Sequence, residues 1–117
     1  MGSMTDHFIK DQANEGKRVD LYTIDGEKTE DYLVICSVHS DLFVNAKEQY
    51  MKDVAAHAAG DGEKPSALKV VASAIKDWSF DEELTPDSAL TFLQNAPHIA
   101  EQVDKLISDV TFFYAKK

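Results

Sequence analysis

Two stretches of β-prone residues near the N-terminus are separated by an Asp-Gly pair. Residues 19–24 alternate between apolar and polar side chains, and residues 28–36 become wholly apolar over 33–36. The pair Asp25-Gly26 between such runs is a strong hairpin signal, because glycine accepts the positive φ of a tight turn. The pattern therefore predicts a β-hairpin whose second strand is buried on both faces near its end.

The middle of the chain has the period of an amphipathic helix. Ser40 is a suitable N-cap, and Asp41 suits the positive end of the helix dipole. Gly60 is a suitable residue to end the helix, and residues 60–65 form the clearest loop in the chain. One stripe at helical spacing consists of Phe43, Ala46, Tyr50, Val54 and His57.

Three further helices are predicted after this loop. Ser66 begins the first, Thr85-Pro86-Asp87 begins the second, and the third runs from about Pro97 to the end of the chain. The first has an apolar stripe of Leu68, Val71, Ile75 and Trp78, and the last has one of Ile99, Val103, Leu106, Val110 and Phe113. Residues 5–18 read as a weakly ordered arm or a short helix.

These elements predict an α+β fold, with an N-terminal β-hairpin packed against about four α-helices. We assign residues 1–3 to an expression scar ahead of Met4 and residues 4–117 to a single domain, a length that suits one modest core. The N-terminus lacks the apolar segment of a signal peptide, and no apolar run approaches the roughly 20 residues of a membrane span.

The charge of the chain limits its partners. Twelve basic residues against 21 acidic ones give a net charge of −9, which argues against direct binding of nucleic acid or of an anionic membrane. A basic or apolar protein partner is compatible with this charge. The densest acidic segment, Asp77 to Asp87, lacks the pattern of a calcium loop and reads as a solvated loop suited to a basic partner.

Candidate catalytic and metal-binding residues are few. The single cysteine, Cys36, ends an apolar strand and is expected to be an inert buried thiol, although His39 follows three residues later. The histidines have no helical zinc spacing, and the sequence has no phosphate-binding glycine loop and no nucleophile elbow. We therefore expect no catalytic residue, no metal and no cofactor. An enzyme would instead need a pocket that holds Cys36, His39 and His57 together.

Aromatic residues gather in the C-terminal half. Adjacent residues on a helix point about 100° apart, so the run Phe112-Phe113-Tyr114 cannot face one core. Aromatic side chains are enriched at interfaces. The candidate partner-binding residues are Trp78, Phe80, Phe112, Phe113 and Tyr114, with packing in the core as the alternative for most of them.

The segment from Ala74 to Phe113 resembles the tail assembly chaperones of long-tailed bacteriophages and prophages. The order is a helix ending in Trp, an acidic loop, a helix start, a short apolar helix, a proline, a long helix and an aromatic end. The residues that match are Ala74-Ile75-Lys76-Asp77-Trp78, Leu84-Thr85-Pro86-Asp87, Leu90, Leu93, Ala96-Pro97-His98-Ile99-Ala100, Val103 and Phe112-Phe113.

The resemblance implies a non-enzymatic role. Such chaperones bind the tape measure protein, a long helical rod, keep it soluble and recruit tail tube protein around it. They work as oligomers in the host bacterial cytoplasm and are absent from the mature virion. Two alternatives remain. The first is a small acidic adaptor, immunity or antitoxin-like inhibitor protein, and the second is a small hydrolase or metal enzyme.

Overall fold

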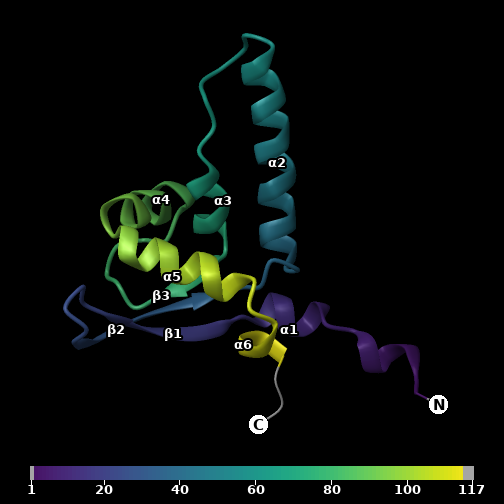
Figure 1. Ribbon diagram of the computed structural model, residues 1–117, viewed down its shortest axis with the longest axis vertical. Helices are drawn as coiled ribbons and strands as arrows, with labels where there is room; N and C mark the ends of the chain where they lie inside the picture. Colours follow the sequence, from purple (N-terminus) through teal and green to yellow (C-terminus); the bar gives the residue numbers. More distant parts are fainter. Residues whose placement is uncertain (1, 115–117) are drawn as a thin grey trace.

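The computed structural model describes residues 2–114 and has an α+β fold, as predicted (Figure 1). A short 3₁₀ helix, Met4–His7, precedes the other elements, which follow in the order α1, β1, β2, α2, α3, β3, α4, α5, α6. Their bounds are α1 Lys10–Glu15, β1 Lys17–Tyr22, β2 Lys28–Ile35, α2 Asp41–Ala58, α3 Ala67–Ser73, β3 Ile75–Trp78, α4 Pro86–Asn95, α5 Pro97–Ile107 and α6 Val110–Tyr114.

The predicted hairpin is confirmed. Strands β1 and β2 pair antiparallel with Val19 opposite Leu33, and both of these side chains are buried. The turn between them is closed by two backbone hydrogen bonds, from Gly26 to Thr23 (2.9 Å) and from Thr23 to Glu27 (2.8 Å). Gly26 has φ +92°, which is the conformation that makes glycine favourable at this turn.

The predicted helix from Ser66 to Trp78 is wrong in its second half. Helix α3 ends at Ser73, and Ile75–Trp78 form β3, which pairs antiparallel with β2 and gives the sheet order β1-β2-β3. The register shifts between Val34 and Ile35, so Lys76 is an extra residue on β3. This bulge turns both Ile75 and Trp78 toward the core. A bulged strand therefore has the same i, i+3 spacing of buried residues as a helix.

The predicted last helix is two helices. Helix α5 ends at Ile107, and the carboxylate of Asp109 accepts a hydrogen bond from the backbone N–H of Phe112 (3.2 Å) at the start of α6. This new start rotates α6 relative to α5. Val110 is consequently 64% exposed, although its spacing from Val103 predicts burial, whereas Phe113 is buried.

The core lies between one face of the sheet and the helices that cover it (Figure 1). Leu33, Ile35, Leu93 and Val103 have no exposed surface. The helix start at Thr85-Pro86 is confirmed, because the Thr85 side chain accepts a hydrogen bond from the N–H of Ser88 (3.1 Å). The Thr85 cap fixes the start of α4, and α5 follows it across the sheet (Figure 1).

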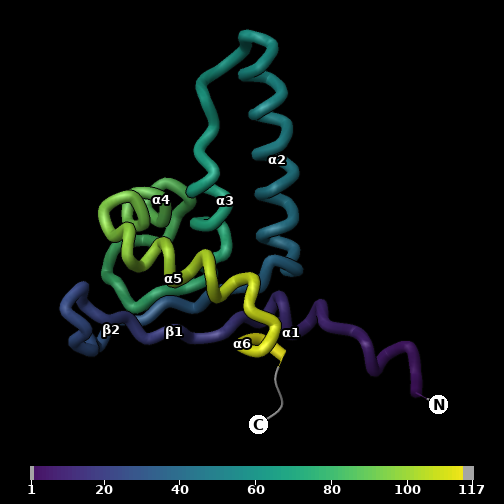
Figure 2. The backbone as a smooth tube through the Cα atoms, in the orientation of Figure 1, coloured from purple at the N-terminus to yellow at the C-terminus, as the bar shows by residue number. Residues whose placement is uncertain are grey.

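Helix α2 projects from the rest of the molecule (Figure 1). Its predicted cap is confirmed, because the Ser40 hydroxyl accepts a hydrogen bond from the N–H of Phe43 (3.2 Å). All eighteen residues of α2, each of them described by the structure, are exposed or half-buried. The chain leaves the tip through Gly60 and returns beside α2 to reach α3, as Figure 2 shows.

Candidate functional site

Trp78 is at the centre of a cluster of three aromatic rings. Its ring centroid is 5.2 Å from that of Phe80 and 6.1 Å from that of Phe92, and the two phenyl rings are 5.0 Å apart. The indole Nε1 donates a hydrogen bond to the carbonyl oxygen of Glu82 (2.9 Å). Trp78 is 8% exposed, whereas Phe80 is half-buried. Phe80 therefore offers surface to a partner, and Trp78 supports it from within.

The acidic segment follows this cluster along the chain. Asp77, Asp81, Glu82, Glu83 and Asp87 are all exposed. Among residues 2–114 the ion pairs join Lys10 to Asp41 and both Arg18 and Lys28 to Asp20, so these five carboxylates have no ionic partner within the described chain. The region beside Phe80 is consequently an acidic, solvated surface.

The C-terminal aromatic run is divided between core and surface. Phe113 is 3% exposed, and Phe112 and Tyr114 are half-buried. The Tyr114 hydroxyl donates a hydrogen bond to the buried Ser37 hydroxyl (2.8 Å). Of the five candidate partner-binding residues, Phe80, Phe112 and Tyr114 thus retain accessible surface. Their contact with a partner stays a prediction.

Cys36, His39 and His57 are not brought together. The Cys36 thiol is fully buried and donates a hydrogen bond to the carbonyl of Asn14 (3.6 Å). Burial raises the pKa of this thiol, and the charge of Lys76 only partly opposes that effect. His39 precedes α2, whereas exposed His57 is in its last turn with Nδ1 3.3 Å from the carbonyl of Gly62. This arrangement does not form the catalytic pocket that the enzyme alternative required.

Over residues 2–114, no three His, Cys, Asp or Glu side chains are grouped so that they could hold a metal ion. Within the same residues, no helix combines the length and the apolar character needed to cross a membrane.

The base of α2 is fixed by the segment that leads into it. The N–H groups of Cys36, Ser37 and Val38 donate hydrogen bonds to three other elements or their ends, and Lys10 donates to the carbonyl of His39 (3.1 Å). The acceptors of the three backbone bonds are the carbonyls of Ala74 (2.8 Å), Ala13 (3.3 Å) and Ile107 (3.0 Å). Because several elements share this segment, α2 leaves the body in a defined direction.

Asp41 adds a second attachment at the same place. Its carboxylate accepts hydrogen bonds from Lys10 Nζ (3.0 Å) and Asn14 Nδ2 (3.1 Å), and its N–H donates to Asn14 Oδ1 (2.8 Å). The hydrogen bond and charge of Lys10, followed by the bond from Asn14, lower the pKa of Asp41. This exposed cluster joins α1 to the first turn of α2.

A groove of about 800 Å³, called here the first groove, lies between α2 and the returning chain. Leu42, Ala46 and Tyr50 form its wall on α2, and Leu84 and Leu90 contribute apolar surface from the side of α4. Charged side chains of both signs also line it: Asp53, Asp61, Glu63, Lys64, Lys69 and Lys76. The result is an apolar groove with a mixed charged border.

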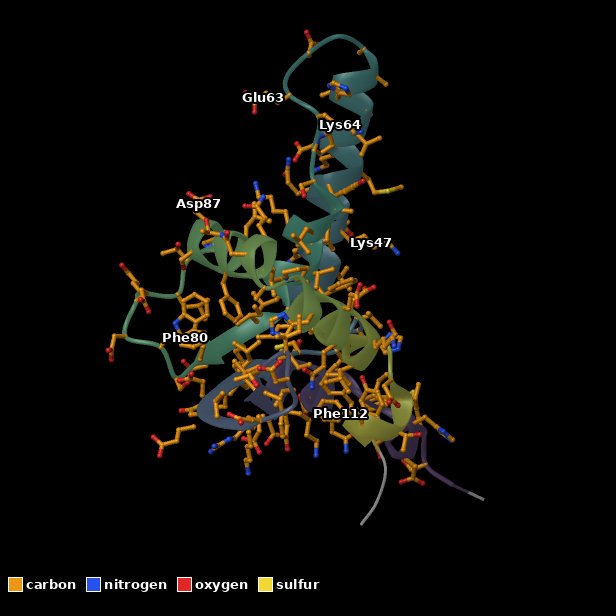
Figure 3. The ribbon with its side chains drawn as sticks, turned by 60° about the vertical axis from the view of Figure 1, so that its left-hand side comes forward. Lys47, Glu63, Lys64, Phe80, Asp87 and Phe112 are labelled. Atoms are coloured by element: carbon orange, nitrogen blue, oxygen red, sulfur yellow. The ribbon has the colours of Figure 1, made fainter. Side chains whose placement is uncertain are left out.

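The second groove, of about 870 Å³, lies on another side of the same helix. Phe43, Val44 and Met51 line it from α2, and Val70 and Val71 line it from α3. Figure 3 shows Lys47, which belongs to this groove, projecting on the opposite side of α2 from Glu63 of the first groove. Helix α2 therefore presents apolar side chains to two grooves, and Tyr50 of α2 and Val70 of α3 line both of them.

The sequence did not reveal these grooves. The stripe of Phe43, Ala46, Tyr50, Val54 and His57 indicates which side of α2 faces the protein, and its first three members are half-buried. Val54 is 42% exposed and His57 is exposed, because the body does not extend to the tip of the helix. The only sequence feature that could have indicated the grooves is the presence of further apolar residues on α2 outside this stripe, including Leu42 and Met51, which are exposed.

Comparison of the chain with protein-family models, with curated proteins and with solved structures gives no match.

Proposed function

We propose that this protein is a non-enzymatic chaperone of phage tail assembly, which binds the tape measure protein and promotes assembly of the tail tube. It acts by stoichiometric binding, as an oligomer, in the cytoplasm of the host bacterium, and is absent from the mature virion. The observation that carries the proposal is the first groove, an apolar groove bordered by charges beside a projecting helix. The resemblance of residues 74–113 to tail assembly chaperones supplies the identity of the client.

The chemistry of the first groove suits a helical client. An amphipathic helix binds a groove by placing apolar side chains at i, i+3, i+4 and i+7 against apolar walls. Leu42, Tyr50 and Leu90 offer such walls. Three carboxylates and three lysines border the groove, so it matches a rod with side chains of both signs better than a purely basic one.

The projection of α2 favours a binding role. Half of the Leu42 surface is exposed, at the end of α2 where the hydrogen bonds of residues 36–41 fix its direction. A fixed apolar surface binds a client with little loss of conformational entropy on the side of the chaperone. A long helical rod with apolar faces needs such a cover before the tube closes around it.

Co-expression with the tape measure protein encoded in the same phage or prophage tests the proposal. We expect the tape measure protein to stay soluble and to co-purify with this chain. Leu42→Asp introduces a charge into the first groove at a half-exposed position and should abolish co-purification without unfolding the protein. Asn45→Asp is the matched control, because it adds the same charge to an exposed site of α2 that lines neither groove.

Two results would contradict the proposal. One is a tape measure protein that remains insoluble with the wild-type chain. The other is a folded Leu42→Asp variant that co-purifies as well as Asn45→Asp does.

A further inference from the structure

One line of apolar side chains along α2 keeps accessible surface from its base to its tip. Val44, Met51 and Ala58 recur at intervals of seven, and Val54 lies beside them, which places all four on one side of a helix. Met51 is 64% exposed and Val54 is 42% exposed. We call these four residues the α2 seam. The second groove lies along its lower half, where Val44 and Met51 line it.

The molecule exposes more surface than a compact monomer does. A folded monomer of 13.0 kDa is expected to expose about 6,300 Å², and this chain exposes 8225 Å². The excess of about 1,900 Å² is spread over all the projecting parts of the molecule, and the α2 seam is one of them; a standard interface takes about 800 Å² from each partner. The radius of gyration, 15.9 Å, likewise exceeds the roughly 13.4 Å expected for this length. Helix α2 and the N-terminal segment are the parts that project (Figure 1).

We propose that the α2 seam binds the α2 seam of a second copy of this chain, with the two helices antiparallel about a two-fold axis. Met51 is the midpoint of the seam, so the axis passes beside it and Val44 of one copy faces Ala58 of the other. The tip of each helix then enters the second groove of the other copy. This contact closes on itself as a dimer, because each copy uses the same surface.

Charge favours a second copy at this surface. Residues 42–58 contain two lysines, Lys47 and Lys52, and two carboxylates, Glu48 and Asp53, so the projecting part of α2 has no net charge. The chain as a whole has a net charge of −9, which repels another copy wherever the acidic surfaces approach. The projecting helix is therefore a place where two copies can meet without net repulsion.

The same charge decides the direction of the helices. Because residues 42–58 are neutral, the net charge of −9 belongs to the rest of the chain. Parallel helices would hold the two acidic bodies side by side. Antiparallel helices place the bodies at opposite ends of a paired segment about 22 Å long, at 1.5 Å per residue over the fifteen residues from 44 to 58.

The first groove stays open in this dimer, because Leu42 and Ala46 lie on a different side of α2 from Met51. One helix thus carries a surface for the client and a surface for a second copy, which adjoin at Tyr50 because this residue lines both grooves. The self-association of the chain can be measured without any client, so the two proposals fail independently.

Sedimentation equilibrium of the full chain tests the inference. We expect a dimer, and we expect Met51→Asp to weaken it by about tenfold or more, because two carboxylates then face each other at the axis. Met51 is largely exposed in the monomer, so this change leaves the fold intact, which circular dichroism checks. Asn45→Asp is again the control and should dimerise as the wild type does.

Cysteine cross-linking tests whether the two α2 helices of the dimer are antiparallel. Met51→Cys should form a disulfide-linked dimer under mild oxidation, since the two copies of residue 51 meet at the axis. Ala58→Cys should form much less, because antiparallel helices hold the two copies of residue 58 far apart. The native Cys36 thiol is fully buried and does not compete.

Three outcomes would overturn the inference. They are a wild-type chain that stays monomeric at millimolar concentration, a Met51→Asp variant that associates as strongly as Asn45→Asp does, and cross-linking that is stronger at position 58 than at position 51. If Met51→Asp loses the dimer while the tape measure protein remains insoluble with the wild-type chain, the dimer is supported. Only the proposal that the tape measure protein is the client is then contradicted.

Discussion

Replacement of Trp78 by alanine separates a core role from a binding role. Trp78 keeps 8% of its surface exposed, so it buries about 230 Å² of the roughly 250 Å² that a tryptophan offers. At about 25 cal/mol per Å² this burial is worth about 6 kcal/mol, and residual burial in the unfolded chain reduces the difference. Because measured losses for buried aromatic-to-alanine changes are about 3–5 kcal/mol, we expect Trp78→Ala to lose about 4 kcal/mol.

That loss is a large part of the total stability. A domain of this length is expected to have an unfolding free energy of about 6–18 kcal/mol, so at the lower end of this range the variant would keep only about 2 kcal/mol. Trp78→Phe keeps an aromatic ring beside Phe80 and Phe92 but loses the hydrogen bond to Glu82. We expect this matched variant to lose only about 1–2 kcal/mol.

Urea unfolding followed by far-ultraviolet circular dichroism measures both variants. Tryptophan fluorescence is unsuitable because Trp78 is the only tryptophan. If Trp78→Ala unfolds within about 1 kcal/mol of the wild type and loses only its binding to the tape measure protein, the argument from burial is refuted. Trp78 would then be a contact residue. Phe80→Ala provides the comparison, since Phe80 is half-buried and should lose less stability than Trp78 does.

Three further predictions concern a glycine, the cysteine and an aspartate in other parts of the structure. Gly16→Ala should lose about 3 kcal/mol in urea unfolding, because φ is +84° and the new Cβ would lie 2.8 Å from a backbone oxygen of β2. Gly62→Ala, with φ +80° and open space around it, should lose only about 1 kcal/mol, and equal losses would contradict the steric argument. The Cys36 thiol should react with a disulfide reagent only on unfolding, since it is buried with a raised pKa, and fast reaction of the native protein would contradict this. Because the pKa of Asp41 is lowered in the folded state, its pairing with Lys10 should stabilise the protein above pH 4 or so and should be lost as the pH falls through the folded value. Asp41→Asn should accordingly be less stable than the wild type at pH 7 and equally stable at low pH, as urea titrations at the two pH values can show.

The sequence determined the elements whose signals are local. The Asp25-Gly26 turn, the Ser40 cap and the Thr85-Pro86 start each depend on neighbouring residues, and all three are present as predicted. The α+β class follows from them, since a hairpin followed by capped amphipathic segments has few other ways to form a core.

Tertiary structure decided the elements that depend on distant partners. Ile75 and Trp78 have a spacing that fits a helix, but the free edge of β2 bonds this segment as a bulged strand. The turn at Asp109 likewise divides a pattern that is continuous in sequence, and it exposes Val110 while burying Phe113. Spacing alone does not distinguish a helix from a bulged strand at Ile75 and Trp78, because both conformations bury these two residues.

The candidate site depended most on the tertiary structure. The sequence named five aromatic candidates for a partner contact without ranking them by exposure. Packing decided that Trp78 and Phe113 are buried, whereas Phe80, Phe112 and Tyr114 are half-buried. The stripe of α2 predicts a helix that packs against the body, whereas the body is too small to cover the whole helix. How far an amphipathic helix extends beyond its core depends on the size of that core, which a local pattern does not contain, and this is why only the structure revealed the two grooves beside α2.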